Sequence, residues 1–204
     1  MKLYYAAGSC SFASHVALSE SGAAFEVERV NLADGDQRKP AFLAINPHGR
    51  VPALVTPDGA ITETIAILTY IARRYPEAHL LPWEAPERLA RAYKMMSWFA
   101  TSVQVSFSQI FRGARFSDDP ETLAELKRAG ATRFALALDE LESLAPAQGW
   151  LVGRDFSVVD AYATVFWRWG PRLSLNMDAY PHWGAHAQRV LARPSAQQVL
   201  AAER

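Results

Sequence analysis

Cys10 is the only cysteine among 204 residues, and it lies in the stretch YYAAGSCSFASH, just before a segment with helical spacing. If residues 11–21 form a helix, Cys10 and Ser11 lie at its N-terminus, where free N–H groups and the helix dipole favour an anion. A thiol in that position has a lowered pKa and reacts near neutral pH. A lone cysteine can equally be a small buried hydrophobic residue. The thiol by itself leaves both interpretations open.

The stretch INPHGRVPAL (45–54) places Pro52 where a strand is expected to begin. Proline cannot donate to a strand ladder, so it belongs at the first residue or on an edge. A cis Val51–Pro52 bond would turn the Val51 N–H and C=O outward, where they could pair with an extended peptide. An ordinary trans proline that opens the strand is the alternative.

The stretch ITETIAIL (61–68) puts Glu63 and Thr64 at the start of an expected helix. The Thr64 hydroxyl and the first free N–H groups suit a carboxylate, and Glu63 suits an ammonium group. Together they could hold both ends of an amino acid's backbone. The alternative is that the threonine is a helix cap and the glutamate complements the helix dipole.

The first 75 residues alternate short strands with helices, which predicts a small mixed sheet covered by helices. Phe25 and Val27 alternate with glutamates, as in a strand that is buried on one face. The expected strands are 2–5, 25–30, 51–56 and a short one after the turn at 57–59; the expected helices are 11–21 and 62–74.

Three prolines mark residues 76–86 as a linker, and residues 87–204 show helical patterns only. Ser157 followed by Asp160 is a capping-box pattern at the start of a nearly all-apolar segment, which predicts a central buried helix. The expected helices are 87–112, 119–143, 156–170 and one that begins at Pro181 and stops before Pro194.

Composition narrows the classes of function. Lys plus Arg equals Asp plus Glu, 21 each, so nothing favours nucleic acid or an anionic membrane as a partner. A single cysteine excludes an intrachain disulfide and a thiolate zinc cage, and no metal is expected. No apolar run approaches the roughly 18 residues of a membrane span. We therefore expect a protein of the reducing cytoplasm.

A thiol, an outward-facing peptide backbone and a site for an amino-acid zwitterion together describe a site for glutathione. The chain resembles the bacterial glutathione transferases, most closely the beta class. The motifs KLYY followed by GSCS, FLAINPHGRVPAL, ITETIAI and FSVVDAY stand in that family's order and at about its spacing. The resemblance covers essentially the whole chain.

The resemblance implies a thioredoxin-like α/β domain at 1–75 that binds glutathione, a linker at 76–86, and an all-helical domain at 87–204 with a hydrophobic-substrate site. It implies a homodimer in which Cys10 is the thiol near the glutathione sulfur and Ser11 is the neighbouring hydroxyl. The first helix N-terminus and a donor such as Ser11 are then expected to stabilise the glutathione thiolate as it attacks a small hydrophobic electrophile. It further implies that Val51 binds the glutathione main chain beside cis-Pro52, and that Glu63 and Thr64 hold the γ-glutamyl end.

The sequence departs from the family at several positions. Gln104 and Val105 stand where the beta class carries histidine and lysine, so Gln104 can contact glutathione by hydrogen bonds but cannot exchange a proton near neutral pH. The loop at 32–42 lacks a clear counterpart of the family lysine that contacts glutathione. Candidate walls for the second substrate are Trp98, Phe99, Phe107, Phe111 and Phe116.

Two other functions stay open at this point. Cys10-Ser11-Phe12-Ala13 resembles a CxxC motif without its second cysteine, so Cys10 could form a mixed disulfide with glutathione and reduce disulfides. Because Gln104 replaces the family histidine, the chain could also bind glutathione or a hydrophobic ligand with little turnover.

Overall fold

The computed structural model describes residues 1–204. Its sheet contains β1 (Lys2–Tyr5), β2 (Glu26–Arg29), β3 (Ala53–Thr56) and β4 (Gly59–Thr62) in the order β2-β1-β3-β4. β1 runs parallel to β2 and antiparallel to β3, and β3 and β4 form a hairpin. Leu3 on β1 is paired with Leu54 on β3, and both side chains are completely buried. The predicted mixed sheet is therefore confirmed.

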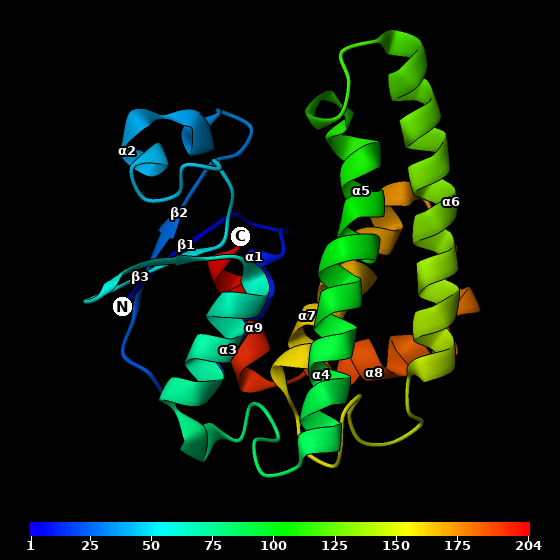
Figure 1. The fold of residues 1–204 in the computed structure, drawn as a ribbon. Coiled ribbons are helices and arrows are strands. Elements are labelled where there is room, and N and C mark those ends of the chain that lie inside the picture. The colour runs from blue at the N-terminus through cyan, green and yellow to red at the C-terminus, as the bar shows by residue number, and fades with distance from the viewer.

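Helices cover both faces of this sheet. On one face lie α1 (Ser11–Glu20) and α3 (Thr64–Arg74), which pack against each other and share the core that contains Leu3 and Leu54. The turn η1 (Asp36–Arg38) and helix α2 (Pro40–Leu43) lie on the other, where Phe42 packs with Val30 and Ala53. Figure 1 shows this layered arrangement, with α2 beside the strands on the side opposite α3.

The prediction that residues 25–30 form a half-buried strand is wrong in its burial. All four residues of β2 are exposed, and the Val27 side chain keeps 40% of its surface in solvent. β2 pairs with β1 only, so it is an edge strand. An alternating pattern predicts a strand, but it does not tell whether another element covers that strand's apolar face.

The second half of the chain is helical throughout. Its elements are η2 (Pro76–Ala78), α4 (Pro86–Trp98), η3 (Phe99–Val103), α5 (Gln104–Phe111), η4 (Gly113–Arg115), α6 (Pro120–Leu144), α7 (Val158–Trp169), η5 (Gly170–Leu173), η6 (Met177–Ala179), α8 (Pro181–Leu191) and α9 (Pro194–Ala202). α4, η3 and α5 follow one another without a break, and α6 lies alongside them (Figure 1). None of these helices combines the length and hydropathy that crossing a membrane requires.

Two features of this half differ from, or extend, the sequence-based expectations, and a third confirms one of them. The helix expected over 87–112 contains a π-helical turn at η3. α9 lies beyond the predicted helices: Pro194 ends the preceding pattern, and proline is also favoured in the first turn of the next helix. The predicted capping box is confirmed: the Ser157 N–H and hydroxyl both donate to Asp160 Oδ2, at 2.9 and 2.7 Å.

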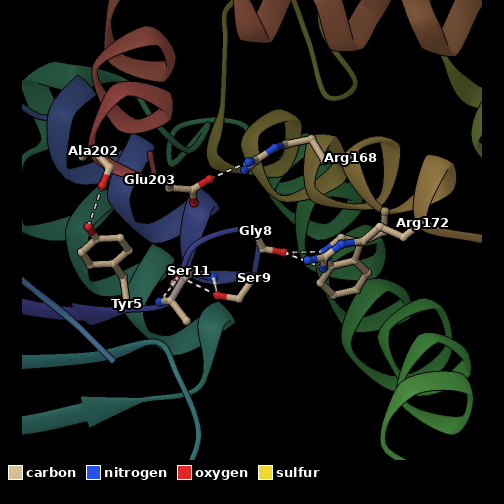
Figure 2. A network of polar contacts seen from close by, with 10 residues as sticks. Tyr5, Gly8, Ser9, Ser11, Arg168, Arg172, Ala202 and Glu203 are labelled. Atoms are coloured by element: carbon tan, nitrogen blue, oxygen red, sulfur yellow. Dashed lines mark hydrogen bonds and ion pairs between the residues drawn. The ribbon is translucent and has the colours of Figure 1, made fainter. Parts of the chain in front are cut away.

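The C-terminal helix returns to the N-terminal sheet. α9 lies beside α1 in Figure 1, and the Tyr5 hydroxyl donates to the Ala202 carbonyl at 2.8 Å. On the same side, Arg168 of α7 forms an ion pair with the mostly buried Glu203 (Figure 2). These contacts tie the two halves of the chain together close to the loop that carries Cys10.

Candidate functional site

A cavity of about 500 Å³ lies where the sheet domain faces α5 and α7. Six of the seven residues predicted for the site line it, and Ser11 does not. The lining residues are Cys10, Asn46, Arg50, Val51, Pro52, Glu63, Thr64 and Ile65 from the first half of the chain, and Ala100, Gln104, Val105, Ser108, Arg115, Phe116 and Tyr162 from the second.

Cys10 is the N-cap residue of α1, as its position in the sequence predicts. Its thiol donates to the Val51 carbonyl oxygen at 3.5 Å, and its sulfur accepts from Gln104 Nε2 at 3.7 Å. Burial raises the pKa of this thiol, and hydrogen bonding by Thr64 and Gln104 offsets only part of that rise. The expected lowering of the Cys10 pKa is therefore wrong, because desolvation of the thiolate outweighs the hydrogen bonds that favour it.

Ser11 is completely buried and lies outside the cavity. Its hydroxyl donates to the Ala6 carbonyl at 3.1 Å, accepts from the Ala6 N–H, and is paired with the Ser9 hydroxyl at 2.6 Å. Figure 2 shows Ser9 and Ser11 next to each other within this loop. The structure therefore contradicts the role given to Ser11 as a donor to a bound thiolate; Ser11 holds the loop's backbone.

The same loop is held from the helical half through the Gly8 carbonyl. This oxygen accepts from Trp169 Nε1 at 2.9 Å and from Arg172 Nη1 at 3.2 Å (Figure 2). Gly8 has a φ of 66°, and a Cβ atom there would lie 3.2 Å from Arg172. The positive φ therefore favours glycine at this position, and the Gly8 carbonyl is held by hydrogen bonds from the helical half of the chain.

The Val51–Pro52 peptide bond is cis, the first of the two alternatives that the sequence left open. The Val51 carbonyl accepts from Cys10, and its N–H makes no hydrogen bond within the chain. A backbone donor therefore remains available at the cavity wall, as strand addition by a peptide ligand requires.

Glu63 and Thr64 lie at the start of α3, as expected. Glu63 is exposed, forms no ion pair and has a φ of 69°, a conformation that non-glycine residues adopt rarely and that is concentrated at functional sites. Thr64 is buried and lines the cavity next to it. An unpaired carboxylate and a helix N-terminus therefore lie side by side in the cavity wall.

Gln104 follows directly on the π-helical turn, a kind of irregularity that is frequent at functional sites. Its side-chain oxygen accepts from the Tyr162 hydroxyl at 2.8 Å, so its Nε2 is directed to the Cys10 sulfur. Burial raises the pKa of Tyr162 well above its usual range, so the phenol keeps its proton and can donate. The structure thus builds a chain of hydrogen bonds from Tyr162 through Gln104 to Cys10.

Sequence reasoning missed Tyr162. It is 1% exposed and belongs to FSVVDAY, which predicts the start of a buried helix and is one of the motifs that carry the family resemblance, but no site role is predicted for this tyrosine. The available signal was a hydroxyl within an otherwise apolar helix, because a buried tyrosine needs a hydrogen-bond partner. Asn46, Arg50 and Arg115 were also not predicted for the cavity.

Of the predicted aromatic walls, only Phe116 lines the cavity. Phe99 is completely buried between Tyr162 and Phe166, and Phe107 stacks on Trp169 with ring centroids 4.0 Å apart. Trp98 and Phe111 also lie outside the lining. These aromatic side chains pack within or against the helical half, so helical spacing alone could not separate them from Phe116.

Two family models match this chain, and together they cover most of its length. The model of the glutathione S-transferase N-terminal domain matches residues 1–73, and that of the C-terminal domain matches residues 85–194. Glutathione S-transferase GstA of Escherichia coli O157:H7 is 34% identical over 212 residues, covering 100% of this chain and 98% of that protein.

Solved structures agree with these matches. A glutathione transferase homologue from Sulfitobacter with bound glutathione is 32% identical, with a TM-score of 0.93 over 98% of this chain and 97% of that one. The beta-class glutathione S-transferase of Sphingomonas chungbukensis is 35% identical, with a TM-score of 0.87 over 100% of this chain and 98% of that one.

Proposed function

Because the chain belongs to the glutathione S-transferase family, we propose that it conjugates reduced glutathione to small hydrophobic electrophiles. The observation that carries this proposal is the composition of the cavity. An unpaired backbone N–H at Val51, the carboxylate of Glu63 and the start of α3 line the same cavity as Cys10.

Glutathione is proposed to lie along this wall with its central residue beside Val51. The Val51 N–H then donates to the peptide backbone. Glu63 pairs with the α-ammonium group of the γ-glutamyl residue, and Thr64 with the N–H groups of α3 holds its α-carboxylate. This orientation brings the glutathione sulfur close to Cys10 and to the side chain of Gln104.

Gln104 is proposed to stabilise the glutathione thiolate in place of Ser11. Its Nε2 already points at a sulfur atom and is fixed in that direction by Tyr162. A preorganised donor lowers the free energy of the thiolate without exchanging a proton, and each pKa unit of lowering corresponds to about 1.4 kcal/mol. The thiol proton then leaves to solvent, and the thiolate attacks the electrophile.

The test is conjugation of 1-chloro-2,4-dinitrobenzene, followed by absorbance, together with calorimetry of glutathione binding. Glu63→Ala should weaken glutathione binding by at least about 1 kcal/mol, because the ligand's ammonium group loses its partner. Glu77→Ala, which removes an exposed carboxylate outside the cavity, is the matched control and should change nothing. An unchanged dissociation constant for Glu63→Ala would remove this residue from the site.

One observation favours a second candidate, a glutathione-binding protein with little turnover: no histidine lines the cavity, and Gln104 occupies the position of the family histidine. Binding of glutathione without product formation would support it. The third alternative, disulfide reduction through Cys10, is disfavoured because burial raises the pKa of that thiol. The free cysteine is consistent with a reducing cytoplasm as the protein's location. Membership of the family supports the proposal that the protein is a homodimer.

A further inference from the structure

One end of the cavity faces a cluster of arginines. Arg50 and Arg115 line it, and Arg38 and Arg112 are close enough to act on Arg115: partial burial and the positive charges of Arg112, Arg50 and Arg38 lower the pKa of Arg115. The formal charge of the whole chain is zero, so this concentration of cations is a local feature.

These four guanidinium groups have no partners within the protein. None of them forms an ion pair, and none donates a side-chain hydrogen bond. The only acidic residue in the cavity lining is Glu63, which the proposed function uses for the ammonium group of glutathione. Arginines that repel one another beside a cavity, without a counter-ion, favour an anionic ligand.

The position of Arg115 indicates which ligand this is. It lies at the end of η4, in the half of the chain that supplies Val105, Ser108 and Phe116 to the cavity. Glutathione is assigned to the opposite wall, at Val51, Glu63 and Thr64. The space next to Arg115 and the half-exposed ring of Phe116 therefore remains for the second substrate.

Resting on the proposed function, we propose that the second substrate is an aromatic or other apolar electrophile that carries a carboxylate, and that Arg115 binds this carboxylate. The planar guanidinium group can donate two parallel hydrogen bonds to the two carboxylate oxygens. Phe116 then covers the apolar body of the molecule. Arg50 contributes positive charge at the same end and raises the local concentration of the anion.

A matched pair of electrophiles tests the proposal: 4-chloro-3-nitrobenzoate and its methyl ester. In both, the glutathione thiolate attacks the carbon that bears chlorine. The new C–S bond forms, chloride leaves with the electron pair of the C–Cl bond, and the thiol proton goes to solvent. The two compounds differ only in whether the group to be recognised is charged.

Arg115→Gln should lower kcat/KM for the benzoate at least tenfold and for the ester less than twofold, with the KM for glutathione unchanged. Arg91→Gln removes the same charge from an exposed position on α4, outside the cavity lining and the arginine cluster, and should change both values less than twofold. Arg115→Lys keeps the charge without the planar fork and should lie between Arg115→Gln and the parent. Because Arg115 is exposed, we expect each variant to fold, which thermal unfolding checks.

Several results would overturn the proposal. Equal losses of kcat/KM for the benzoate and the ester in Arg115→Gln would do so. A second such result would be a KM for glutathione that rises in Arg115→Gln, while the KM for γ-glutamylcysteine, which lacks the glycyl residue, does not. Arg115 would then bind the glycyl carboxylate of glutathione. Conjugation of the ester without any conjugation of the benzoate overturns the proposal while the proposed function stands. Conjugation of neither electrophile, nor of 1-chloro-2,4-dinitrobenzene, removes both.

Discussion

At the scale of single residues, Cys10 shows that position along a helix and reactivity are separate properties. The residue is the N-cap of α1, yet it is 6% exposed and its thiol donates to a carbonyl. A helix N-terminus lowers the pKa of a thiol only where its favourable interaction with the thiolate exceeds the free-energy cost of removing the thiolate from water. Cys10 therefore lines the cavity with a thiol that keeps its proton, and the glutathione sulfur is proposed as the nucleophile.

The raised pKa of Cys10 predicts how stability depends on pH. Below the unfolded thiol's pKa of about 8.5, both states are protonated and the group has no effect. Above it, the unfolded chain loses the proton while the folded one keeps it, so the free energy of unfolding should fall as the pH rises from about 8.5 towards the folded pKa. Urea unfolding between pH 8 and pH 10 measures this slope. Cys10→Ala should flatten it, and an equal slope in both proteins would contradict the burial argument.

Tyr162 should matter for the rate because it orients Gln104. Tyr162→Phe removes the hydroxyl that the Gln104 oxygen accepts, so the amide is free to turn its Nε2 away from the sulfur. We expect kcat/KM for 1-chloro-2,4-dinitrobenzene to fall about tenfold, which corresponds to about 1.4 kcal/mol, and the pKa of bound glutathione to rise in the pH–rate profile. A merely structural role would leave that pKa unchanged. Tyr93→Phe, whose hydroxyl pairs with Thr69 away from the cavity, is the control.

At the scale of elements, α7 is the helix on which the site depends. It supplies Tyr162 to the cavity, and its first turn is held by Asp160, which accepts from the Ser157 N–H and hydroxyl, the Leu151 N–H and His186 Nε2. Asp160 and His186 are both completely buried. The Asp160 carboxylate therefore supplies the acceptors for a cluster of polar groups that is buried in the helical core.

Replacement of this cap should be far more costly than replacement of an exposed one. Asp160→Ala leaves several buried donors without acceptors and should destabilise the fold by about 3–5 kcal/mol. Asp119 caps α6 at the surface through the Thr122 N–H, and Asp119→Ala should cost about 1 kcal/mol. Urea unfolding of both variants compares them directly, and similar losses would contradict the argument from burial.

At the scale of the whole molecule, the resemblance to glutathione transferases predicts a homodimer. One feature suggests where copies would meet: Leu136 on α6 is 61% exposed beside a groove that Trp98, Thr101 and Arg133 also line. Light scattering at micromolar concentration should report twice the 22.6 kDa mass of the chain. Leu136→Arg should shift this equilibrium to monomer, whereas Leu144→Arg, near the end of the same helix, should not. A monomeric parent protein would refute the assembly, and a dimeric Leu136→Arg variant would refute its location.

The sequence by itself determined the fold class, most elements and six of the fifteen residues that line the cavity. Hydrophobic periodicity, the capping box at Ser157 and the turn at 57–59 are local signals, and the motifs around Cys10, Pro52 and Glu63 are contiguous. Six predicted residues consequently line one cavity. The elements follow from neighbours within a few positions of the chain, where spacing and backbone preference suffice. Gln104 and the meeting of the motifs at one site follow from the resemblance to a known family.

Only the tertiary structure decided the direction in which side chains point and how much water reaches them. The inward Ser11 hydroxyl, the raised pKa of Cys10 and the exposure of β2 all depend on which element covers which. Gln104 contacts a sulfur 94 positions away and is oriented by Tyr162, a further 58 positions along the chain. Burial and hydrogen bonding of this kind arise from contacts between distant segments, so no local pattern records them.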